Sequence, residues 1–209
     1  MATRRGPFDS HPDRSGRIFE AQHLGSIDDG PKYRELVAKY WDGRSTKRVG
    51  DETLPYLSYR DAMQVVKECQ VRPPTDPPKR LGQDLRTAVI DAIGERINLG
   101  EQRGDQEIRS VRFYTAGGSI LDKIHGIDGF LEVDDPEAGK TYVTTIDVSV
   151  SSEKLSGAKP AKADILIGEV PDAVEQPAAY YDAVEHLAGQ ITAHILAQKQ
   201  SPDGYRRAS

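Results

Sequence analysis

The chain is poor in cysteine, in net positive charge and in long apolar runs. Cys69 is the only cysteine among 209 residues, so no intramolecular disulfide and no cysteine-based zinc site can form. The formal net charge is −5, so nucleic acid would need a local basic patch. No apolar run approaches the roughly 20 residues of a membrane span, and none follows the basic start of the chain. We therefore expect a protein of the cytoplasm, or of the virion if it is viral, with no membrane partner and no secretory signal.

Apolar residues are also scarce, at 37% of the chain, while there are 13 prolines and 19 glycines. The usual share is roughly 45–50% on a count that includes glycine, so a moderate core with substantial loops or tails is expected. The sequence predicts five regions, which are an extended or disordered arm (1–30), a small helical region (31–72), a Pro-rich linker (73–79), a mixed α/β core (80–199) and a polar tail (200–209).

The arm contains only scattered apolar residues among Gly, Pro, Asp, Ser and Arg. Alone it could not bury enough surface to order itself. Two interpretations stay open: a disordered tail, or an arm that docks on other protein subunits through its isolated apolar residues.

Four segments have apolar residues at helical spacing, namely 31–43, 58–70, 79–99 and about 178–198. Four others read as strands, namely 107–115, 127–133, 141–150 and 163–170. The second and third strands are joined by a turn that contains Asp-Pro and Gly, which predicts a hairpin. This order predicts a mixed α/β (α+β) fold, with a small central sheet of about four strands flanked by helices.

Two of the predicted strands each carry an aspartate among apolar residues, Asp128 and Asp147. Side chains alternate between the two faces of a strand, so Asp147 shares its face with Ser149. If the hairpin closes, Asp128 and Asp147 become cross-strand neighbours near one end. Two close carboxylates repel each other unless a cation bridges them, and such oxygen ligands suit Mg²⁺ or Mn²⁺.

Both aspartates also have simpler interpretations. Asp128 lies between glycines and can be a turn or bulge residue. Asp147 can pair with Lys154, Lys162 or Arg112 as a salt bridge at the rim of the sheet.

The segments G-I-D-G-F (126–130) and I-D-V-S (146–149), with helices before and after them, resemble the PD-(D/E)XK nuclease superfamily. The resemblance covers about residues 80–198. It implies a core of a helix, three strands, a helix and a strand, with Asp128 as the first motif acid and Asp147 as the second. It further implies Mg²⁺ or Mn²⁺ as cofactor, nucleic acid as substrate, and Glu95 as an additional acid on the preceding helix.

The chain departs from the family pattern at three points. Ser149 stands where the motif has lysine, no proline precedes Asp128, and the strand that carries Asp147 leads toward another strand instead of a helix. Lys154 or Lys162 could supply the missing ammonium from another position, as in members with a migrated lysine.

Two functions follow from these features. The missing lysine, the negative charge and the arm favour a non-catalytic interaction or structural subunit of a larger assembly such as a virus particle, which needs no cofactor. The alternative is a magnesium-dependent nuclease with Asp128, Asp147, Lys154 and Lys162 in its catalytic site and Asp128, Asp147 and Glu95 as metal ligands.

Overall fold

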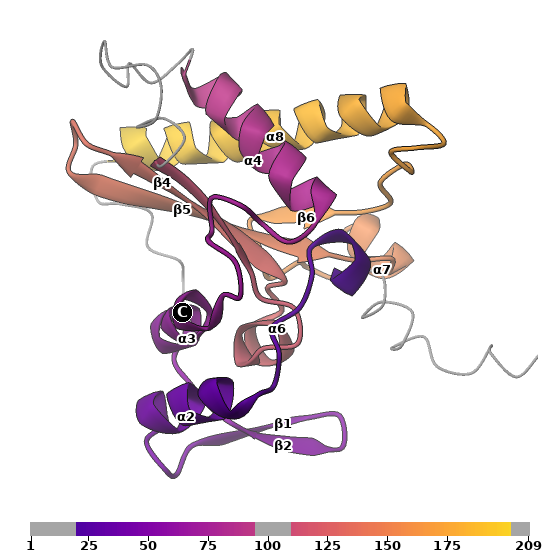
Figure 1. Ribbon diagram of the computed structural model, residues 1–209. Helices are drawn as coiled ribbons and strands as arrows, with labels where there is room; N and C mark the ends of the chain where they lie inside the picture. Colours follow the sequence, from indigo (N-terminus) through magenta and orange to yellow (C-terminus); the bar gives the residue numbers. More distant parts are fainter. Residues whose placement is uncertain (1–19, 95–109, 202–209) are drawn as a thin grey trace, which may run out of the picture.

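The computed structural model describes residues 20–94 and 110–201 (Figure 1). A mixed sheet of four strands forms its centre, in the order β3-β4-β5-β6, with β6 parallel to β5 and the other pairs antiparallel. The elements are α2 (Pro31–Tyr40), β1 (Thr46–Val49), β2 (Glu52–Pro55), α3 (Tyr59–Cys69), α4 (Arg80–Gly94), β3 (Val111–Thr115), α6 (Ile120–His125), β4 (Gly129–Asp135), β5 (Lys140–Val148), α7 (Ser152–Leu155), β6 (Ile165–Ile167) and α8 (Pro177–Gln200). The predicted mixed α/β fold with a four-stranded sheet is confirmed.

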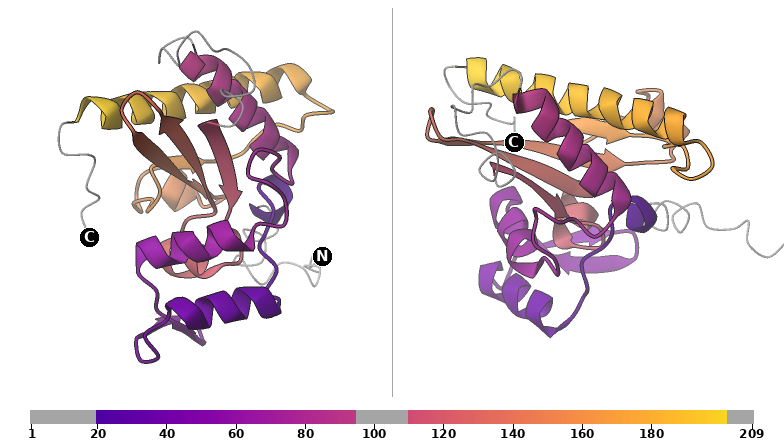
Figure 2. Two further views of the ribbon diagram at one scale, coloured as in Figure 1. Left: turned by 60° about the vertical axis from the view of Figure 1, so that its left-hand side comes forward. Right: turned by 45° about the horizontal axis from the view of Figure 1, so that its top comes forward.

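The sheet separates two layers of helices, as both views in Figure 2 show. Helices α4 and α8 cover one face, and α2, α3 and α6 lie on the other with the β1–β2 hairpin. The alternation of side chains along β4 explains both layers, because Leu131 joins the core under α4 and α8 while Phe130 joins the core under α3 and α6. No helix in the described part of the chain is both long and apolar enough to cross a bilayer.

Three elements go beyond the sequence prediction. The β1–β2 hairpin turns at Gly50, whose φ of +59° favours glycine. Helix α6 begins after Ser119, whose hydroxyl accepts from the amide of Leu121 at 3.1 Å. The third element is the four-residue helix α7 between β5 and β6, so the expectation that the strand carrying Asp147 runs on to another strand without a helix is wrong. Strand β5 ends at Val148, two residues before the predicted end at 150, and Val150 is 46% exposed.

The segment that precedes the helical region packs on the sheet from residue 20 onward. Leu24 is 1% exposed, and its carbonyl accepts from the Thr115 hydroxyl at 2.8 Å. The Ile27 amide donates to the Gly117 carbonyl at 2.8 Å. The Pro-rich stretch is also docked, since Phe113 donates its amide to Pro74. Residues 1–19 of the predicted arm and 202–209 of the predicted tail lie outside the described residues.

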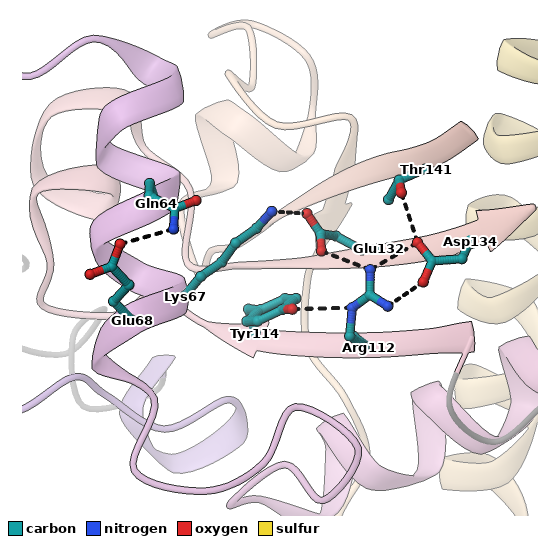
Figure 3. A network of polar contacts seen from close by, with 8 residues as sticks. All are labelled: Gln64, Lys67, Glu68, Arg112, Tyr114, Glu132, Asp134 and Thr141. Atoms are coloured by element: carbon teal, nitrogen blue, oxygen red, sulfur yellow. Dashed lines mark hydrogen bonds and ion pairs between the residues drawn. The ribbon is translucent and has the colours of Figure 1, made fainter. Parts of the chain in front are cut away.

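A polar network ties helix α3 to the sheet (Figure 3). Glu132 of β4 is 4% exposed and forms ion pairs with Lys67 of α3 and with Arg112, its cross-strand partner on β3. Arg112 also binds Asp134, and the hydrogen bonds to this carboxylate hold the pKa of Arg112 well above its usual range. Glu132 therefore carries a buried charge that two cations compensate.

Replacing Glu132 by Gln is expected to lower the free energy of unfolding by about 2–3 kcal/mol, because two half-buried cations lose their shared carboxylate. Urea unfolding measures the change. The matched control is Glu137→Gln, in the exposed β4–β5 turn, which should stay within about 0.5 kcal/mol of the wild type. Equal stability of the two variants would contradict a structural role for the network.

Candidate functional site

Asp128 and Asp147 lie opposite each other on neighbouring strands. The β4–β5 register pairs Gly129 with Ile146, so one further step pairs the two aspartates. Just outside the ladder, the Asp128 amide donates to Ile146 O at 2.8 Å. Asp128 Oδ2 accepts from the Val148 amide at 2.7 Å. Asp128 and Asp147 are 2% and 3% exposed, so both carboxyl groups are buried near the open end of the hairpin.

Lys154 of α7 holds Asp147. Its Nζ lies 3.0 Å from Oδ1 and 2.8 Å from Oδ2 of Asp147. Of the three cations considered for a salt bridge, Lys154 is therefore the one that contacts both oxygens, while Arg112 binds Glu132 and Asp134. The pair is buried on the Asp147 side and reaches partial exposure on the Lys154 side. Helix α7 thus places the Lys154 ammonium beside Asp147, although position 149 of the same strand end is a serine.

Two further acids, Glu20 and Asp122, lie close to Asp128. One carboxylate oxygen from each of the three residues lies within 4.8 Å of the others. Asp122 is held there by the start of α6, because its Oδ2 accepts from the Gly118 amide at 2.7 Å. Glu20 comes from the helical residues 20–23. A cavity of ≈ 130 Å³ lies beside them, and its lining includes Glu20, Asp122 and Lys123.

Neither Glu20 nor Asp122 was predicted from the sequence as a site residue. The pattern Ser-x-x-Asp at 119–122, a weak form of the capping box, could have indicated the helix that carries Asp122. Glu20 lies in a segment whose apolar residues show no periodicity, so no sequence pattern indicated it as a site residue. Glu95, the acid that the family resemblance implied, lies outside the described residues.

Burial and, after it, the neighbouring acids change the protonation of Asp128. Burial raises the pKa of Asp128 to about 9, and the charges of Asp122, Glu20 and Asp147 act in the same direction. At neutral pH this carboxyl group therefore holds a proton when no cation is bound. A divalent cation would relieve the same repulsion and displace that proton.

The three acids suit a small oxygen-binding cation. Oxygens around one Mg²⁺ lie about 2.1 Å from the ion, and therefore about 3–4.2 Å from one another. The separation of up to 4.8 Å among Glu20, Asp122 and Asp128 needs only a small inward movement to match. The donor set is hard oxygen throughout, which favours Mg²⁺ or Mn²⁺ over zinc.

The second candidate lysine, Lys162, contacts a different group. Its Nζ lies 3.3 Å from the carbonyl oxygen of Ile124. Lys47 of the β1–β2 hairpin lies 3.3 Å from the same oxygen. Lys162 still influences the site through its charge, because Asp147 and Lys154 are among the groups that shift its pKa.

Comparison with protein-family models, with curated proteins and with solved structures gives no match.

Proposed function

We propose that this protein is a divalent-metal-dependent enzyme that cleaves phosphodiester bonds of nucleic acid. The observation that carries the proposal is the position of buried Asp128, whose carboxylate accepts from the Val148 amide next to Asp147, with the Lys154 ammonium 2.8 Å from Asp147. Glu20 and Asp122 add two oxygen donors beside Asp128. Carboxylates for a cation and an ammonium for a developing negative charge are the groups that phosphodiester hydrolysis uses.

The order of elements also supports the proposal. Helix α4, the antiparallel strands β3, β4 and β5, the short helix α7 and the parallel strand β6 follow one another in the chain, with α6 inserted between β3 and β4. The PD-(D/E)XK superfamily has the same succession of a helix, three strands, a helix and a strand. Under this proposal Asp128 is the first motif acid, Asp147 the second, and Lys154 the migrated lysine.

In the proposed site, Asp128, Glu20 and Asp122 would hold the metal, which supplies a Lewis acid for the phosphate and a more acidic water molecule. Asp147 fixes the Lys154 ammonium in place through two hydrogen bonds. The ammonium then stabilises negative charge that develops on the phosphate oxygens. Burial of both aspartates removes water and strengthens each of these interactions.

A non-catalytic role remains the second candidate, and one observation favours it. Lys154 occupies both oxygens of Asp147, so the chain itself neutralises this buried acid, as a structural ion pair does. In that case the sheet would serve binding within an assembly, and the acids would have no substrate.

The deciding experiment is cleavage of single- and double-stranded DNA and RNA with Mg²⁺, with Mn²⁺ and with a chelator. We expect wild-type protein to cleave at least one substrate only when metal is present, and Asp147→Ala to lose this activity. The matched control is Asp182→Ala, an exposed acid on α8, which should cleave like the wild type. No cleavage by the wild type, or equal cleavage by Asp147→Ala, would rule out the proposed enzyme.

A further inference from the structure

Two lysines from distant parts of the chain converge on one carbonyl oxygen. Lys47 lies on β1, Lys162 lies just before β6, and each Nζ is 3.3 Å from Ile124 O. Ile124 belongs to the last turn of α6, where carbonyls carry partial negative charge. The two ammonium groups are thereby held near each other at the edge of the proposed cleavage site.

The backbone of the α6 C-terminus is shaped to receive Lys162. Gly126 caps the helix with a φ of +66°. A Cβ atom at this position would come within 3.2 Å of Lys162 Cδ. Because glycine has no side chain, the stem of Lys162 lies directly over the turn. Lys162 therefore sits in a defined position despite its exposure to solvent.

Three other lysines lie close enough to Lys162 to act on its charge. Partial burial lowers its pKa, and the charges of Lys47, Lys154 and Lys159 lower it further, while Asp147 raises it. Asp147 is itself bound by Lys154. Gathered ammonium groups repel one another, and a bound anion relieves that repulsion. The chain as a whole carries a net charge of −5, so this cluster is the kind of local basic patch that nucleic acid requires.

We propose that Lys47 and Lys162 form a phosphate-binding site for the nucleic-acid backbone, next to the bond that is cleaved. This inference rests on the proposed function, because it assigns the cluster to a phosphate that neighbours the one beside Lys154. A strand carries a phosphate at every nucleotide, so a strand positioned at Lys154 presents further phosphates within reach. The β1–β2 hairpin, which carries Lys47, then acts as part of the substrate-binding surface.

A purely structural role for the two lysines is the competing explanation, since cations near a helix C-terminus stabilise its last carbonyls. That role predicts a loss of stability and no loss of affinity. The two explanations therefore differ in what a lysine substitution changes.

The test measures fluorescence anisotropy of labelled single- and double-stranded DNA oligonucleotides with the full chain, in Ca²⁺ and in chelator, so that binding is separated from cleavage. We expect Lys47→Gln and Lys162→Gln each to weaken binding about 5–10-fold, and to lower the slope of log affinity against log salt by about 1 each. Lys140→Gln is the matched control, because Lys140 is exposed at the other end of β5 from Asp147, and it should bind like the wild type. Urea unfolding of each variant shows whether the fold is kept.

Each outcome supports or overturns the phosphate site. Unchanged affinity of both lysine variants, with or without reduced stability, assigns the lysines to helix capping. Competition by inorganic phosphate at the same phosphate concentration as the oligonucleotide assigns the site to a free phosphate ion. Lysine-dependent binding without any metal-dependent cleavage supports the phosphate site while rejecting the enzyme. Metal-dependent cleavage with lysine-independent binding supports the enzyme and rejects the phosphate site.

Discussion

Replacing Asp128 by Asn is expected to abolish metal-dependent cleavage and, at the same time, to stabilise the metal-free protein. Cleavage should fall by at least about 10³-fold, since a ligand of the metal is lost. The stabilisation follows from the raised pKa of about 9 of Asp128 in the folded protein, against an ordinary value of 3.8. Asparagine keeps an oxygen for the Val148 amide and carries no charge.

The pH dependence of the metal-free wild type follows from the same shift. Between pH 4 and 9 the folded protein holds a proton on Asp128 that the unfolded chain has released. The contribution of Asp128 to the free energy of unfolding is therefore constant below about pH 4. It falls as pH rises toward 9, by at most about 1.4 kcal/mol per pH unit. At pH 8 Asp128→Asn should be more stable than the wild type by about 2–4 kcal/mol, and the difference should vanish near pH 4.

Urea unfolding in chelator from pH 4 to 9 measures this effect, and Mn²⁺ should stabilise the wild type and leave the variant unchanged. Asp134→Asn is a useful comparison, because hydrogen bonds from Arg112 lower the pKa of Asp134 and its loss should destabilise the protein above pH 4. A wild-type stability that rises from pH 5 to 8, with Asp128→Asn following the same curve, would contradict the account of this site.

Replacing Lys154 by Met is expected to reduce cleavage by about 10²–10³-fold, because the ammonium that faces the developing charge is lost. The variant should also leave Asp147 buried without its cation, which destabilises the metal-free protein by about 2–4 kcal/mol.

Lys154→Arg separates charge from shape in this experiment. Arginine keeps a cation beside Asp147, so stability should stay near that of the wild type, while cleavage should fall between the wild type and Lys154→Met because the guanidinium has a different geometry. Cleavage by Lys154→Met at the wild-type rate, in samples shown to be folded, would reduce Lys154 to a structural partner of Asp147.

Much of the fold was predictable because burial imposes periodicity on the sequence. The helical spacing in α4 and α8, the apolar strand-like segments of β4 and β5 and the turn between them identified the elements of the core and the hairpin between Asp128 and Asp147. The β1–β2 hairpin was missed because its strands are mostly exposed, so no apolar alternation marks it, although the Gly50-Asp51 turn was a usable signal. Helices α6 and α7 are too short to show a helical period.

Only the site residues that the β4–β5 hairpin positions could be predicted from the sequence. The turn between β4 and β5 sets the register, and the register brings Asp128 opposite Asp147. Glu20 reaches the site through tertiary packing of the segment around Leu24, which no local pattern encodes. The sequence left Lys154 and Lys162 as equal alternatives, and the position of α7 distinguishes them.

The central claim is that Asp128 and its acidic neighbours bind a divalent cation beside the Asp147–Lys154 pair. Anomalous X-ray diffraction from crystals of the wild-type protein grown with Mn²⁺ tests it most directly. The account predicts one manganese peak in contact with a carboxylate oxygen of Asp128 and of at least one other acid among Glu20, Asp122 and Asp147. A peak is expected to be absent from Asp128→Asn crystals under the same conditions. No manganese at Asp128 in the wild type, with Lys154 still bound to Asp147, would contradict the claim.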